Sequence, residues 1–272
     1  MKKTIIASAI AAVVAAPAAF ADVTISGQIN VETIETGSST ATTTNTDVFL
    51  SSSEDLGNGM KAGMKMQFVT DDGADTNGGH TALYLSGDFG TIDMGQMEGY
   101  TESKIAALAA NDAFEDMSIE VADGSNAGFS NIIRYTSPSF NGLSVGVERG
   151  ETAGTDAVFA KYSNAGLTVV AANEKDGAND IMTIAAIYKM GDMEFRVVDQ
   201  DDDSGDSETF IGAAYTMGAN KLAVAVIDGG DTDGDYTASL THSLSKSTSV
   251  YVGVKSDDNG DDQTGFGMKH SF

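Results

Sequence analysis

The sequence predicts an all-β fold, a transmembrane antiparallel β-barrel of sixteen strands whose third long extracellular loop folds into the lumen. Three observations predict it. Short runs of residues alternate apolar and polar side chains, which is the period-2 pattern of half-buried strands. The connectors between these runs alternate between short turns and longer polar segments, as in outer-membrane barrels. One connector, residues 97–129, is too long for an ordinary connection in a compact domain.

The N-terminus is typical of an exported protein. Lys2 and Lys3 precede an apolar run, residues 5–16, and a small-x-small site at residues 19–21. We therefore expect residues 1–21 to be a signal peptide and residues 22–272 to form one barrel domain. No later apolar stretch approaches the ~20 residues that a membrane-spanning helix needs.

Composition narrows the class of partner. The formal net charge is −25 and cysteine is absent. An acidic chain of this kind is not expected to bind nucleic acid, and cations are its natural partners. Without disulfides the fold must be held by burial or by a closed hydrogen-bond network.

The alternating runs are taken in order from residue 23. They lie near residues 23–36, 46–54, 60–69, 80–88, 91–96, 130–137, 143–149, 156–163, 167–173, 180–190, 193–199, 208–217, 221–228, 235–244, 248–255 and 263–272. An even number is what a bacterial barrel requires, although fourteen or eighteen strands stay open. In the clearest run Lys61 and Lys65 share a face opposite to the methionines. We place them in the lumen, because a lysine facing lipid costs ~2–4 kcal/mol.

The connectors define two rims. Every second connector is a short turn, such as residues 57–59 or 164–166, and the others are longer and mostly rich in Asp. The first of the longer set, residues 37–46, is an uncharged Ser/Thr tract. Aromatic or His residues recur just before short turns and predict an interfacial girdle at that rim; they are Tyr135, Tyr162, Tyr188, Tyr215 and His242.

The long connector, residues 97–129, combines a short helical patch at residues 101–110 with carboxylates. We expect these carboxylates to face basic residues of the wall and to set up a field across the pore. The loop acids are Glu98, Glu102, Asp112, Glu115 and Asp116, and the wall bases are Lys61, Lys65, Arg134 and Arg196. A solvated loop is the alternative for the acids, and a structural ion pair is the alternative for Arg134.

Asp-rich loops near the C-terminal half raise the question of metal. Carboxylates are the ligands that calcium prefers, but the twelve-residue calcium-loop spacing is not met, since Tyr236 stands where that loop needs Gly. Candidate calcium ligands at the extracellular rim are Asp201, Asp203, Asp231, Asp233 and Asp235. A solvated acidic rim is the alternative that we favour, and no cofactor is required.

Enzyme motifs are missing. His80, His242 and His270 lie far apart in the sequence without metal-ligand spacing, and there is no Gly-x-Ser-x-Gly. We expect no enzyme activity, although a membrane-embedded hydrolase could hide a Ser/His pair.

Three passages resemble the general porin family of Gram-negative outer membranes. Residues 131–146, NIIRYTSPSFNGLSVG, resemble the central strand, turn and strand of that family. Residues 87–96, GDFGTIDMGQ, resemble the hairpin before its constriction loop. Residues 267–272, GMKHSF, resemble its last strand. Gln96 departs from the family, which often has Arg at that place on the pore wall.

The resemblance implies a homotrimer of sixteen-stranded barrels in the outer membrane, in contact with its lipid and lipopolysaccharide. It also implies that the terminal Phe272 is read by the barrel-assembly machinery. The expected function is passive diffusion of small hydrophilic solutes and ions, with a preference for cations. The competing hypothesis is an exported calcium-binding β-sandwich adhesin.

Overall fold

The computed structural model describes residues 22–71, 78–101, 103–104, 114, 130–151, 155–176, 179–203, 205, 207–229, 234–256 and 260–272. The expected signal peptide, residues 1–21, lies outside them, so its cleavage stays a prediction. Within these ranges the strands are β1 (Asp22–Thr36), β2 (Ser39–Gly57), β3 (Met60–Asp71), β4 (Gly78–Gly87), β5 (Gly90–Met97), β6 (Ser130–Thr136), β7 (Leu143–Gly150), β8 (Asp156–Asn164), β9 (Leu167–Asp176), β10 (Asn179–Met190), β11 (Met193–Asp202), β12 (Ser207–Met217), β13 (Asn220–Gly229), β14 (Tyr236–Ser243), β15 (Thr248–Ser256) and β16 (Gln263–Ser271).

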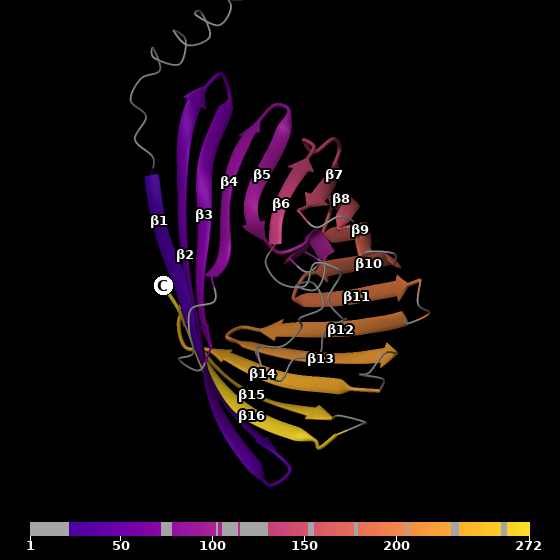
Figure 1. Ribbon diagram of the computed structural model, residues 1–272. Helices are drawn as coiled ribbons and strands as arrows, with labels where there is room; N and C mark the ends of the chain where they lie inside the picture. Colours follow the sequence, from indigo (N-terminus) through magenta and orange to yellow (C-terminus); the bar gives the residue numbers. More distant parts are fainter. Residues whose placement is uncertain are drawn as a thin grey trace, which may run out of the picture.

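These strands form one sheet that closes on itself. Each strand pairs antiparallel with the next, and β1 pairs with β16 from Gln28↔Ser271 to Thr36↔Gln263. Figure 1 shows β1 (indigo) beside β16 (yellow) in this continuous wall. The closed sheet confirms the sixteen-stranded barrel. It rules out the two-sheet sandwich and the fourteen- and eighteen-stranded alternatives, because all sixteen strands hydrogen-bond in a single ring.

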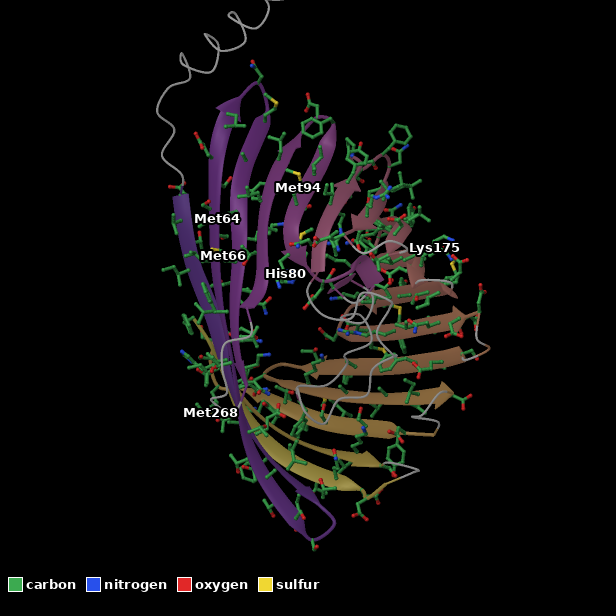
Figure 2. All side chains as sticks on the ribbon, in the orientation of Figure 1. Met64, Met66, His80, Met94, Lys175 and Met268 are labelled. Carbon is green, nitrogen blue, oxygen red and sulfur yellow. The ribbon has the colours of Figure 1, made fainter. Side chains whose placement is uncertain are left out.

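Side chains alternate between an apolar outer face and a mostly polar inner face. On β7, Val145 and Val147 are about half exposed on the outside, whereas Glu148 between β6 and β8 is buried on the inside. Met94 and Met268, labelled in Figure 2, are about half exposed, whereas His80, also labelled there, lines an internal cavity. No helix in the described ranges is long and apolar enough to cross a membrane.

The short-turn rim has the expected features. Gly57, Asn58 and Gly59 all adopt positive φ (79°, 52° and 75°), the backbone conformation that a tight turn here requires and that Gly and Asn tolerate. The aromatic residues expected at this rim lie on the outer face; Tyr135, Tyr188 and Tyr215 are 36–45% exposed. The ring nitrogen Nδ1 of His242 lies 2.9 Å from Asn220 Oδ1.

The prediction that residues 37–46 form the first long connector is wrong. β2 begins at Ser39, so only Gly37 and Ser38 turn the chain. The Thr-rich tract is a strand because β-branched side chains suit extended backbone, and its backbone pairs with β1 down to Thr36↔Ser39. The rim with the longer connectors therefore has a tight hairpin between β1 and β2.

One part of the inner face is apolar. It consists of Val170, Ala172, Ala185, Val198, Phe210, Ala225 and Ile227, on β9 to β13, and we call it the apolar side. Phe210, Val198, Ala185 and Ile227 are fully buried. The inner wall of this barrel is thus divided between apolar and charged regions.

Candidate pore lining

Charged side chains form a row across the inner wall from β5 to β9. Cross-strand pairing places Asp93 opposite Arg134 and Arg134 opposite Glu148, and then Glu148 opposite Ala157 and Ala157 opposite Glu174. Directly paired residues point to the same face of a sheet. Asp93, Arg134, Glu148 and Glu174 therefore form one line of side chains inside the barrel, which we call the charged row.

Arg134 is the centre of the charged row. Its Nε donates to Glu148 Oε2 over 2.5 Å, and one terminal nitrogen donates to the backbone oxygen of Glu98 over 2.7 Å. The side chain of Arg134 is 9% exposed and that of Glu148 is fully buried. A buried pair of this kind is costly to break, because the remaining partner would be an uncompensated charge. Arg134 therefore ties two strands to the start of the segment that follows β5.

A carboxylate of the wall binds the first turn of that segment. The backbone N–H of Thr101 donates to Glu174 Oε1 over 3.0 Å. A helical turn starts here, with the N–H of Ser103 donating to the oxygen of Gly99 over 3.0 Å. The first N–H groups of a helix have no partner within it, and carboxylates stabilise that positive end. The wall thus caps the turn, which is the short magenta coil after β5 in Figure 1.

The side chain of Tyr100 packs against apolar residues of the inner wall. Its ring stacks on Phe159 of β8, with centroids 3.5 Å apart and planes 8° from parallel. Phe159 packs with the apolar side, and both rings are 5% exposed. Burial raises the pKa of the Tyr100 hydroxyl, and the nearby Arg134 opposes that rise. Residues 98–101 are therefore held by backbone contacts to the charged row and by a ring contact to the apolar side.

Phe114 makes a second contact with the inner wall. Its ring meets Tyr251 of β15 edge-on, with centroids 4.8 Å apart, and it packs with Ile34 of β1. Tyr251 is 2% exposed and donates from its hydroxyl to Asn30 and Glu32. Phe159 and Tyr251 stand on β8 and β15, which are almost opposite each other in a ring of sixteen strands.

A cavity of about 600 Å³, which we call the alcove, lies beside the charged row. Its basic lining residues are Lys65, Lys104, Arg134 and Lys161. Lys65 lies 3.3 Å from Asp93 Oδ1 and 5.3 Å from the centre of the Tyr84 ring. Burial lowers the pKa of Lys104, and so do the positive charges of Arg134, Lys65 and Lys161, while Glu98 opposes them.

The expected wall bases are separated by the structure. Lys65 and Arg134 both line the alcove, whereas Lys61 and Arg196 do not. Arg196 donates to Glu194 over 2.6 and 2.8 Å on β11, and Lys61 pairs with Ser86 near the short-turn rim.

Of the expected loop acids, Glu98 is described, and its carboxylate lies 3.3 Å from His80 Nε2. Glu102, Asp112, Glu115 and Asp116 lie outside the described residues, so their position against the wall stays a prediction. Sequence reasoning missed Glu148, Glu174, Lys104 and Lys161. Glu148, Glu174 and Lys161 could have been identified, because they lie at the inward-facing positions of alternating strands. Lys104 lies outside any alternating run.

The candidate calcium ligands are also only partly described. Asp231 and Asp233 fall outside the described residues. Asp235 is 2% exposed and lies 3.5 Å from Lys255, a competing positive charge. Across the described ranges, no group of three or more His, Cys, Asp or Glu side chains is arranged to hold a metal ion. Calcium at the rim stays a prediction.

The chain matches a family of known proteins. The family model described as Gram-negative porin matches residues 7–262. The chain belongs to the Gram-negative porin family. Its family and its closed barrel make it a multi-pass β-barrel protein of the outer membrane, and both are those of non-enzymatic channels.

Relatives and solved structures agree with this assignment. This porin is 27% identical over 180 residues to the major outer membrane protein P.IA of Neisseria meningitidis serogroup B, covering 61% of this chain and 46% of the relative. The match thus spans less than half of that relative. A triple mutant of Rhodopseudomonas blastica porin superposes with a TM-score of 0.76 at 17% identity, covering 93% of this chain and all of that one. Salmonella typhi OmpF in complex with daunomycin superposes with a TM-score of 0.77 at 13% identity, covering 92% of this chain and 97% of that one. These distant likenesses support the fold.

Proposed function

We propose that this porin is a passive diffusion channel for small hydrophilic solutes and ions, with a preference for cations and no enzyme activity. The observation that carries the proposal is a closed barrel whose inner face bears a row of charged side chains while its outer face is apolar. A wall of this kind suits water inside and lipid outside. No energy-coupling step is required.

Residues 97–129 are proposed to fold into the lumen and narrow it. Two contacts support this proposal: Tyr100 stacks on β8, and Phe114 meets β15 on the far side of the ring. A connection that touches opposite inner walls is well placed to restrict the pore, and pore width limits which solutes pass.

The preference for cations rests on the charge of the whole chain. The formal net charge of −25 and the Asp-rich connectors should make the pore mouth negative, which raises the local concentration of cations and repels anions. The effect weakens as salt screens it, over a Debye length of about 10 Å at 0.1 M.

The proposed binding partners of this porin follow from its family and from its apolar outer face. The apolar outer face fits outer-membrane lipid, and lipopolysaccharide is the expected outer neighbour. We expect three copies to assemble as a homotrimer. The C-terminal Phe272, whose backbone pairs with Gly27 through two 3.0 Å bonds, is the proposed recognition signal for the barrel-assembly machinery.

Single-channel recording in planar lipid bilayers tests the proposal. Purified porin should produce stepwise currents, and in a KCl gradient the reversal potential should have the sign of a cation-preferring pore. A protein that inserts without conducting would contradict the channel. A reversal potential of the opposite sign would contradict only the ion preference.

A further inference from the structure

The alcove has an imbalance of charge that the diffusion function does not use. Four basic side chains line it, namely Lys65, Lys104, Arg134 and Lys161. Among the described lining residues the only carboxylate is Asp93. In a chain with a net charge of −25, a cavity with this lining is unexpected.

Two of these positive charges are already compensated. Arg134 is paired with Glu148 at 2.5 Å and Lys65 with Asp93 at 3.3 Å. Lys161 and Lys104 make no ion pair with any carboxylate in the described part of the chain. The Nζ of Lys104 donates only to the neighbouring backbone oxygen of Ser103, over 3.2 Å. Two ammonium groups are therefore available to a ligand.

The basic groups lie close enough to repel one another. The positive charges of Arg134, Lys65 and Lys161 all contribute to the lowered pKa of Lys104, after the larger effect of burial. An anion between these groups would relieve the repulsion and would accept charge-assisted hydrogen bonds from them. The site is thus electrostatically prepared for a negative ligand and not for a cation.

We propose that the alcove is a binding site for a small organic dianion of the phosphate monoester class, with Lys104 and Lys161 as its two principal ligands. This inference rests on the channel function proposed above, because the alcove faces the lumen. Lysine ammonium groups bind phosphate as point charges, and two of them match a dianion.

The rest of the lining suits the organic part of such a ligand. A volume of about 600 Å³ is within the range of small-molecule sites. Phe49, which is 38% exposed, supplies apolar surface, while Ser51 and Ser144 supply hydroxyl groups that can bond to polar substituents. A sugar-sized phosphate ester would use both kinds of surface.

Current blockade in single channels tests the proposal. Glucose 6-phosphate, added in 0.1 M KCl at pH 7.5, should interrupt the potassium current in proportion to its concentration. Glucose is the matched control, since it differs only by the phosphate, and it should not interrupt the current at the same concentration. Inorganic phosphate should act more weakly than the ester, because it leaves the apolar surface unfilled. Raising KCl to 1 M should weaken the blockade through screening.

Variants locate the site. Replacing both Lys104 and Lys161 by Gln should raise the half-blocking concentration at least about tenfold, which corresponds to about 1.4 kcal/mol. Replacing both by Arg should largely preserve the blockade and checks that the variants fold. Lys246→Gln removes the same charge from a short turn outside the lumen and should change nothing.

The outcomes separate the two proposals. Equal behaviour of glucose and glucose 6-phosphate, or unchanged blockade in the double Gln variant, would overturn the dianion site while leaving the channel intact. The absence of any stepwise current would contradict the channel function itself.

Discussion

The inner wall uses two different means to hold the same piece of chain. The charged row binds the backbone of residues 98–101 through Arg134 and Glu174. Next to it, Phe159 and the apolar side receive the ring of Tyr100. Hydrogen bonds fix direction and register, whereas apolar burial adds attraction without direction. The segment therefore starts at a defined place on the wall, and each region of the wall can be tested separately.

The largest effect is expected from breaking the charged row. Arg134→Met leaves Glu148 buried without its cation, which should destabilise the folded barrel by about 3–5 kcal/mol. The measurement is urea unfolding of the reconstituted porin. Arg196→Met is the comparison, because its pair with Glu194 is more exposed, and it should cost clearly less. Equal losses in both variants would mean that the row has no special role.

Removing the ring contact between Tyr100 and Phe159 should have the second-largest effect on stability. Phe159→Ala leaves a space under Tyr100 and should cost about 3 kcal/mol, the lower end for a buried phenylalanine. The same unfolding assay applies. Val158→Ala changes the next residue of β8, which is 56% exposed on the outer face, and should have little effect. If Val158→Ala were as costly as Phe159→Ala, the stacking contact would not be what stabilises the segment.

The acids of the long segment are expected to act on selectivity and not on stability. Neutralising Asp112, Glu115 and Asp116 together, as Asn, Gln and Asn, should lower the permeability ratio of potassium to chloride roughly twofold in dilute KCl. The reversal potential measures this ratio. An unchanged value would remove this part of the chain from the selectivity argument.

The smallest effect concerns pH. Because the pKa of Lys104 is lowered, its positive charge is lost at a lower pH than for an ordinary lysine. Loss of a positive charge in the lumen should raise the cation preference, by roughly 1.5-fold between pH 7 and pH 9.5. Reversal potentials at the two pH values give the change. Lys104→Gln should show a much smaller change, and an identical change in that variant would assign the titration to other groups.

The alternating pattern was sufficient to predict the barrel, because a period of two fixes which side chains face lipid. The pattern failed at residues 37–46, where a run of Thr carries strand propensity without apolar alternation. The ion pair between Arg134 and Glu148 could have been predicted from the register of the hairpin that joins β6 and β7.

The rest of the lining depends on tertiary contacts that no local pattern encodes. The capping of Thr101 by Glu174 requires a segment to meet a strand far along the chain, because the two residues are 73 positions apart. The apolar side arises on strands that are apolar on both faces, such as β9 with Val169, Val170 and Ala171 in succession. Sequence period alone does not show which face of such a strand is inner.

Thiol modification at a single wall position tests the central claim most directly, since the chain contains no cysteine of its own. In single channels formed by Lys161→Cys, a water-soluble charged methanethiosulfonate reagent should produce a stepwise change in current. The same reagent should leave Val158→Cys channels unchanged, because that position on β8 faces outward. An unaltered current in Lys161→Cys channels, or an equal change in both variants, would contradict a barrel whose charged inner wall lines the path of ions.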